Sequence, residues 1–376
     1  MNIKNQIFFY NKTMRLALLS LFFSFTNLYS QSDKFFDFYQ NNLESLSKVY
    51  NKDFIIGTAV SYKDIKNPKL SKLITKHYSS ITAENEMKPE ALLKDDGSFS
   101  WEKADAIMEF AKTNDLMVRG HTLIWHKQTP EWFFKDSNGN LLDKESLYER
   151  LYEYMKAVMT RYKDISVWDV VNEAVSNDHN SENLYRDKGS MWYKICGEEF
   201  IEVAFRYAHE IDPTKKLFYN DFNLTKPIVK QRKTIKMLKK LIKKDVPIDG
   251  IGIQAHLFVY DSPKLLDNAL KNFSKLGLDI QITELDLSFF KGGDKRLHKD
   301  FVFDKEKEMN QAKAYESVFK TLKKYSNNIS AVTFWGVSDL HSWLNYKQVK
   351  GRRNYPLLFN DEYLPKFSFF SIYNLR

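Results

Sequence analysis

Two glutamates in this sequence each follow an apolar run of the kind that forms a buried strand. Glu173 comes after residues 167–171 (VWDVV) and Asn172, and Glu284 comes after residues 280–283 (IQIT). Two carboxyl groups facing across a cleft can cleave a glycosidic bond, because one protonates the leaving oxygen while the other supports the positive centre. Either glutamate alone could be a surface residue at the start of a helix. The occurrence of both after buried runs favours a catalytic pair.

Polar side chains follow the other apolar runs as well. These residues are Glu84, Asn85, Glu86 and Lys88; His121, Trp125, His126 and Gln128; Tyr219, Asn220 and Asp221; Gln254 and His256; Asp286; and Trp335, Asp339 and Trp343. The carboxyl ends of parallel strands in a barrel meet at one mouth, where catalytic groups gather. The sequence therefore predicts one polar site built from many strand ends.

The elements that would position these residues alternate along the chain. Candidate strands lie near residues 54–60, 78–83, 116–122, 166–172, 216–220, 249–254, 278–283 and 330–335, and helical patterns occupy residues such as 101–113, 144–161, 198–210 and 306–325. Eight strands alternating with helices predict an α/β fold, a (β/α)8 TIM barrel. An open doubly wound sheet is the alternative, but the glycine fingerprint of dinucleotide binding is missing after the first strand.

Residues 1–30 have the features of a secretory signal peptide. Lys4, Lys12 and Arg15 are basic, residues 16–25 are mostly apolar, and Ser30, Gln31 and Ser32 follow. The apolar run is shorter than the roughly 20 residues that cross a bilayer; a buried core helix is the alternative. No linker or repeat divides the rest. We therefore expect residues 33–376 to form a single catalytic domain, secreted or periplasmic after cleavage near residue 30, with no membrane anchor.

The formal charge of +9 is concentrated in the lysine-rich stretch 226–244. Ile235, Leu238, Leu241 and Ile242 repeat there at helical spacing, so the lysines are expected to form the solvated face of an amphipathic helix. A weak attraction to anionic polysaccharide is the alternative. No nucleic-acid motif is present. His121 and His126 lack a recognised metal spacing, and residues 136–140 (DSNGN) are interpreted as a turn. We expect neither a metal nor another cofactor.

Seven segments in order resemble glycoside hydrolase family 10. They are ITAENEMKPE (81–90), RGHTLIWHKQTPEW (119–132), WDVVNEAV (168–175), YNDFN (219–223), IGIQAH (251–256), ITELD (282–286) and FWGVSDLHSW (334–343). The resemblance extends from about Phe54 to Asn374. It implies a (β/α)8 fold and a retaining endo-1,4-β-xylanase that hydrolyses internal bonds of xylan, or of xylo-oligosaccharides, as a monomer.

The resemblance also implies roles for individual residues. Glu173 would be the general acid/base and Glu284 the nucleophile. Asn172 would hold the 2-hydroxyl of the sugar at the cleaved bond, and His256, oriented by Asp286, would hydrogen-bond the nucleophile. The substrate would be bound by Glu84, Asn85, Lys88, His121, Trp125, Gln128, Tyr219, Gln254, Trp335 and Trp343, with Tyr219 stacking beyond the cleaved bond.

The sequence departs from the family pattern in three places. Lys127 stands where a smaller polar residue is common, Leu344 and the basic stretch 347–353 replace a different loop, and residues 366–368 (KFS) replace a proline-containing helix start. Alternative interpretations are a β-1,4-glucanase on the same scaffold and a polysaccharide-binding protein that has lost catalysis. Because the loop after Trp343 borders the cleft, these departures are expected to affect the subsite preferences and the tolerance of xylan side branches.

Overall fold

The computed structural model describes residues 28–346 and 349–375. Helix α2 (Leu28–Asn42) represents a first compact unit that ends at Asn42, and a second unit begins at Leu43. The predicted signal peptide lies almost wholly outside the described residues. Across the part of the chain that the structure describes, every helix is too short or too polar to pass through a lipid bilayer.

The second unit is a closed parallel barrel of eight strands. The ring contains β1 (Ile55–Val60), β2 (Ser80–Ala83), β3 (Met117–Trp125), β4 (Val167–Asn172), β5 (Lys216–Asp221), β6 (Gly250–Ile253), β8 (Asp279–Ser288) and β9 (Ile329–Phe334). Pairing of β6 with β8 and of β9 with β1 closes it. The eight predicted strands all correspond to strands of the ring, so the predicted barrel is confirmed.

One short strand was not predicted from the sequence. Strand β7 (His256–Phe258) follows β6 after two residues and pairs in parallel with the far end of β8. Its register places His256 opposite Asp286. A three-residue strand has too few side chains to show an alternating pattern. This strand matters because it brings a histidine to the mouth of the barrel.

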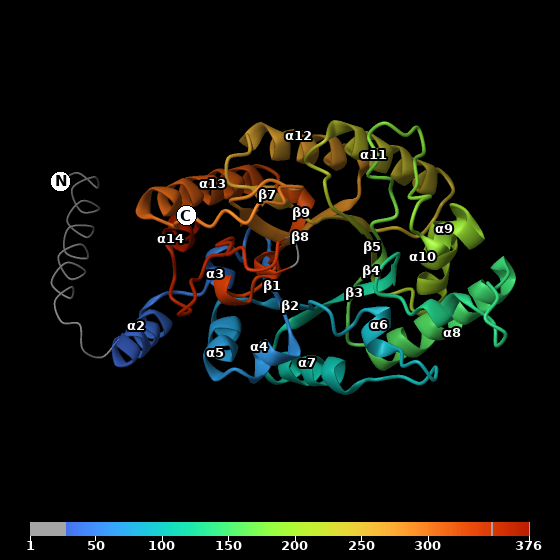
Figure 1. Ribbon diagram of the computed structural model, residues 1–376, viewed down its shortest axis with the longest axis horizontal. Coiled ribbons are helices and arrows are strands. Elements are labelled where there is room, and N and C mark those ends of the chain that lie inside the picture. Colours follow the sequence, from blue (N-terminus) through green and yellow to red (C-terminus); the bar gives the residue numbers. More distant parts are fainter. Residues whose placement is uncertain (1–27, 347–348, 376) are drawn as a thin grey trace. The chain divides into compact units, whose positions relative to one another are not determined.

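Helices surround the strands on the outside (Figure 1). The longer ones are α5 (Pro68–His77), α7 (Glu102–Thr113), α8 (Lys144–Arg161), α10 (Glu199–Ile211), α11 (Ile228–Lys243), α12 (Pro263–Phe273) and α13 (Lys305–Lys324). The shorter ones are α3 (Leu46–Val49), α4 (Tyr62–Lys66), α6 (Pro89–Leu92), α9 (Met191–Cys196) and α14 (Phe367–Tyr373). Side-chain caps begin several of them: Asp143 accepts from Ser146 N at α8, and Asp304 accepts from Lys307 N at α13.

The barrel interior combines apolar packing with a buried polar cluster. Gly120 faces Trp168 across the β3–β4 pair, and a Cβ at Gly120 would lie 2.2 Å from the indole ring. Below the mouth, Asp169 pairs with Arg119 and lies 2.9 Å from His121 Nδ1. The guanidinium of Arg119 also reaches Gln281. Each charged group in this cluster has a partner, as buried charges require.

The lysine-rich helix α11 differs from the prediction at two positions, Ile242 and Lys230. Leu238 and Leu241 are buried, and Lys236 and Lys239 lie on the solvated face, as expected. Ile242 is 37% exposed, outside the expected apolar face. Lys230 is fully buried, and its ammonium contacts Asp221 at 2.6 Å. The expectation that all these lysines are solvated is therefore wrong for Lys230, because an acidic partner on β5 compensates its charge.

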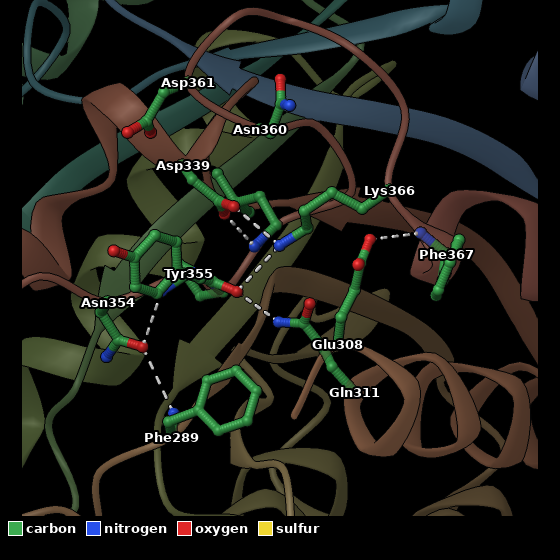
Figure 2. Close-up of polar contacts among 12 residues, drawn as sticks. Phe289, Glu308, Gln311, Asp339, Asn354, Tyr355, Asn360, Asp361, Lys366 and Phe367 are labelled. Atoms are coloured by element: carbon green, nitrogen blue, oxygen red, sulfur yellow. Dashed lines mark hydrogen bonds and ion pairs between the residues drawn. The ribbon is translucent and has the colours of Figure 1, made fainter. Parts of the chain in front are cut away.

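The segment after the barrel is held by a buried ion pair of the same kind as Lys230–Asp221, formed by Lys366 and Asp339 (Figure 2). The ammonium of Lys366 donates to Asp339 Oδ2 at 2.7 Å and to the carbonyl oxygen of Tyr355 at 3.0 Å. The side-chain amide of Gln311, on α13, donates to the same carbonyl oxygen. The pair thus joins the loop after β9 to the residues that precede α14.

Candidate active site

The two glutamates meet at the carboxyl ends of the strands. Glu173 follows β4 directly, and Glu284 lies in the second half of β8. Both are buried and line one cavity of about 160 Å³. The other residues around this cavity are Lys88, His121, Trp125, Lys127, Asn172, Phe222, Gln254, His256, Trp335 and Trp343.

A chain of three side-chain amides connects the two carboxyl groups. Gln254 Nε2 donates to Glu173 Oε1 at 3.2 Å and to Asn172 Oδ1 at 3.3 Å. Asn220 Nδ2 donates to the same Asn172 oxygen at 3.1 Å and to Glu284 Oε1 at 2.9 Å. The hydroxyl of Thr283 donates to Asn220 Oδ1 at 2.6 Å, which orients that amide. The two glutamates are therefore held in a common frame before any substrate binds.

Glu284 is surrounded by donors that favour its ionised form. Its Oε2 lies 3.1 Å from His256 Nε2, and His256 Nδ1 lies 3.0 Å from Asp286 Oδ2. Burial alone would raise the pKa of Glu284, but the hydrogen bond and charge of His256, helped by His121 and Asn220, lower it below its usual value. Burial opposes protonation of His256, yet Asp286 and Glu284 raise its pKa to about 10. Glu284 is thus a carboxylate beside an imidazolium.

Glu173 has a different environment. Its backbone is left-handed, with φ of 57°, a conformation that costs about 1–3 kcal/mol for a residue other than glycine. Two contacts hold that backbone: Glu173 N donates to Asn220 O at 2.9 Å, and Arg186 Nε donates to Glu173 O at 2.9 Å. The carboxyl group accepts one hydrogen bond, from Gln254. Two carboxyl groups with such unequal surroundings can take the separate roles of acid and nucleophile.

Three predicted substrate ligands form a cluster at one end of the cavity. Lys88 Nζ donates to Asn85 Oδ1 at 3.0 Å, and Gln128 Nε2 approaches the same oxygen at 3.4 Å. The Lys88 ammonium also lies 4.8 Å from the centre of the Trp125 ring. Glu84 is half-buried beside Asn85 in the sequence. Of these ligands, Lys88 and Trp125 line the cavity itself.

The aromatic wall also contains predicted residues. Trp343 Nε1 donates to Asp286 Oδ2 at 2.8 Å, and its ring lies 5.0 Å from that of His256. The Trp335 ring stands edge-on to His121 at 5.4 Å. Indole faces in such a cavity can stack on the apolar face of a sugar ring.

Tyr219 is the predicted ligand that the structure contradicts. It is fully buried, and its hydroxyl donates to Asp221 Oδ2 at 2.5 Å while accepting from Val175 N at 2.9 Å. The side chain therefore points behind Glu173, and no sugar can stack on it. Phe222 lines the cavity instead. Phe222 lies one residue beyond β5, so the alternation of the strand did not indicate its direction.

A second cavity of about 740 Å³ continues the first one. Phe222, His256 and Trp343 border both cavities, and the larger one extends to Asn177, His179, Asn223, Lys226, Phe258 and Lys291. A cavity of about 710 Å³ near Met117 and Ser166, at the other ends of the strands, contains none of the predicted site residues. The site is thus part of an extended cleft, a shape suited to a polymer rather than to a small molecule.

Nowhere in the described ranges do His, Cys, Asp or Glu side chains form a group of three or more that could hold a metal ion. Two unequal carboxyl groups at the mouth of a (β/α)8 barrel, in an open cleft walled by indole rings, define a glycoside hydrolase.

Comparison with known proteins gives the family. The sequence pattern of glycosyl hydrolase family 10 matches residues 45–375, and the chain belongs to this family. A β-1,4-xylanase of Dictyoglomus thermophilum is 43% identical over 333 residues, which cover 88% of this chain and 90% of the relative. Endo-1,4-β-xylanase A of Caldicellulosiruptor saccharolyticus is 44% identical, with 87% of this chain and 95% of the relative covered.

Solved structures agree with this assignment. An endo-1,4-β-xylanase from Caldicellulosiruptor owensensis superposes with a TM-score of 0.84 at 45% identity, covering 89% of this chain and all of the other. A mutant protein in complex with xylotriose superposes with a TM-score of 0.83 at 42% identity. The superposition covers 88% of this chain and 99% of the mutant protein. The family and the fold inferred from the seven segments are both confirmed.

Proposed function

We propose that this chain hydrolyses internal β-1,4 bonds of xylan with Glu173 as general acid/base and Glu284 as nucleophile. The chain is a retaining endo-1,4-β-xylanase, as its family membership and its xylanase relatives indicate. The observation that supports the assignment of roles is the asymmetry between the two carboxyl groups. Glu284 is held ionised by His256, whereas Glu173 accepts a single hydrogen bond.

In the first step, a Glu284 oxygen attacks the anomeric carbon, and the bond from that carbon to the leaving oxygen breaks. Glu173 gives its proton to that oxygen, so the leaving sugar departs as a neutral alcohol. In the second step, Glu173 takes a proton from water, and the water oxygen displaces Glu284. Two displacements at one carbon retain its configuration. Retention requires carboxyl groups about 5–5.5 Å apart, and this spacing stays a prediction.

The remaining residues bind and orient the sugar in this scheme. Asn172 donates to the 2-hydroxyl of the reacting sugar, while Trp335 and Trp343 enclose its ring. Glu84, Asn85 and Lys88 hold the next sugar on the non-reducing side, and Asn85 already contacts both Lys88 and Gln128, a residue of the reacting subsite. A similar structure contains xylotriose, and xylo-oligosaccharides are the ligands expected along the cleft of this chain.

Two variants test which glutamate does what. With Glu284→Ala, turnover should fall by roughly 10⁴-fold or more on every substrate, because no covalent intermediate can form. With Glu173→Ala, the first step should survive on a nitrophenyl glycoside, whose leaving group needs little protonation. Added azide should then give a β-glycosyl azide with Glu173→Ala and an α-glycosyl azide with Glu284→Ala. Exchanged products would show that the two roles are reversed.

The substrate is tested with the wild-type protein. Reducing sugar should be released from xylan far faster than from carboxymethylcellulose. Equal release would favour a β-1,4-glucanase, and no release from either polymer would favour a binding protein.

The same proposal includes export. Residues 1–30 direct secretion to the periplasm or the medium, because a basic start and a short apolar run are recognised and removed. Mass spectrometry of exported protein should find an amino terminus near Gln31 or Ser32. An intact amino terminus on protein in the cytoplasm would contradict it.

A further inference from the structure

A buried ion pair lies behind the catalytic acid. Asp221, the last residue of β5, and Lys230, in the first turn of α11, contact each other at 2.6 Å, and both side chains are fully buried. The Lys230 ammonium also lies 3.5 Å from the centre of the Phe222 ring. A buried ion pair is weak evidence for stability, because desolvation of the charges offsets their attraction. Its position is therefore the more informative property.

The pair is connected to the acid by one hydroxyl group. Tyr219 donates to Asp221 Oδ2 at 2.5 Å and accepts from Val175 N at 2.9 Å, two residues after Glu173. Burial raises the pKa of this phenol well above its usual value, so the hydroxyl keeps its proton and its direction. The strained backbone at Glu173 is thus anchored on its far side by a neutral phenol that a carboxylate orients.

The pair is also close enough to Glu173 for a charge effect. Burial raises the pKa of Asp221, Lys230 lowers it, and the charge of Glu173 raises it further. Burial lowers the pKa of Lys230, while Asp221 and Glu173 raise it. Since electrostatic coupling is mutual, the carboxylate and the ammonium must act on Glu173 with opposite signs.

We propose that Tyr219, Asp221 and Lys230 are positioning residues for the catalytic acid. Through the hydroxyl of Tyr219 they fix the segment that carries Glu173, and through their balanced charges they set the pH range in which the enzyme works. This inference rests on the proposed role of Glu173 as the acid/base.

Other titratable and charged groups lie around Glu173 or around its neighbours Arg186 and Lys230, and they must stay constant in a test. Arg186 binds its backbone oxygen from the loop after β4. His126 stays neutral, because burial and the nearby cations Arg186, Lys127 and Lys230 lower its pKa to about 2. The titratable side chains that line the same cavity as Glu173 are Lys88, Lys127, His121, His256 and Glu284. None of these is altered in the variants below.

The test is the pH dependence of kcat/KM on xylohexaose. The basic limb of this profile reports loss of the proton from the catalytic acid of the free enzyme. Asp221→Asn leaves a positive charge behind the acid, and the basic limb should move down by about one pH unit. Lys230→Met leaves a negative charge, and the limb should move up by a similar amount. The double variant should return the limb to within about 0.3 pH unit of the wild type.

Two further variants separate this effect from damage to the fold. Asp339→Asn, at the other buried lysine–aspartate pair, is the matched control and should leave both limbs in place. Tyr219→Phe keeps both charges and the volume. It should lower kcat/KM on xylohexaose about 10-fold more than on a nitrophenyl xylobioside, which needs little help from the acid.

The outcomes are distinct. Limbs that stay in place in the folded Asp221→Asn and Lys230→Met variants, or that move in the same direction, would overturn the charge effect. Should either single variant fail to fold, Tyr219→Phe decides, and equal losses on the two substrates would overturn the proposal. Failure of the proposed function would show differently, as absence of xylan cleavage by the wild type.

Discussion

Two buried lysine–aspartate pairs in this barrel have nearly the same chemistry and different surroundings. Lys230–Asp221 and Lys366–Asp339 have N–O distances of 2.6 and 2.7 Å, and each side chain is at most 3% exposed. In both pairs burial raises the pKa of the aspartate and lowers that of the lysine. The first lies behind Glu173, whereas the second joins the loop after β9 to the chain before α14 (Figure 2).

The difference between the pairs lies in what they contact. Besides Asp339, the Lys366 ammonium donates to the carbonyl oxygen of Tyr355. Asp339 also accepts a hydrogen bond from Leu357 N at 2.8 Å. These are contacts between chain segments. Asp221 is joined through Tyr219 to the backbone two residues after Glu173, the proposed catalytic acid. A buried ion pair therefore has no function of its own, and its neighbours decide whether it affects catalysis or only stability.

The largest expected difference between the pairs is in activity. Lys230→Met and Lys366→Met each leave a buried carboxylate without its partner, and each should lower the free energy of unfolding by about 3–5 kcal/mol. At a temperature where both variants are folded, Lys230→Met should lower kcat/KM roughly 100-fold, because the acid is displaced, and Lys366→Met less than roughly 5-fold. Urea unfolding and steady-state kinetics measure the two quantities. Equal loss of activity in the two folded variants would remove the distinction.

The next difference is in the pH dependence of stability. Burial raises the pKa of Asp339 to about 6, above its unfolded value near 3.8. The folded protein thus holds this proton more tightly, and the contribution of Asp339 is largest below pH ~4 and is lost as the pH rises through about 6. The stability of the wild type relative to Asp339→Asn should fall by about 2–3 kcal/mol between pH 4 and pH 7. Urea midpoints at several pH values check this, and a constant difference would contradict it.

The smallest expected effect concerns the aromatic ring beside each ammonium. Lys230 lies 3.5 Å from the centre of the Phe222 ring, and Lys366 lies 5.1 Å from that of Phe303. Phe222→Leu should cost about 0.5–2 kcal/mol of cation–π stabilisation, and Phe303→Leu less than about 0.5 kcal/mol. Because Phe222 also lines the cleft, its loss alone should raise KM for xylohexaose. An equal rise in KM with Phe303→Leu would show that the second pair also acts on the cleft.

The sequence predicted the order of the elements well, and it singled out most of the residues that line the cavity around the two glutamates. Glu284, His256 and Asp286 make the contacts with one another that were expected from the resemblance. The errors have a common cause. Tyr219 was assigned to the cleft, and Lys230 to the solvated face of α11, yet both side chains turn inward to Asp221. A residue type and its period cannot reveal a partner that lies on another element.

The sequence by itself determined which residue types form the site and which segments form the strands that carry them. Apolar runs of strand length, each ending in polar residues, specify eight strands, and a parallel barrel must bring their carboxyl ends to one mouth. The tertiary structure alone decided how those ends meet. Asn220 joins Asn172 to Glu284 across 48 and 64 residues of sequence, and Lys230 is buried against Asp221. Such contacts depend on how the closed barrel directs each side chain, and this direction is a property of the packed strands rather than of any one segment.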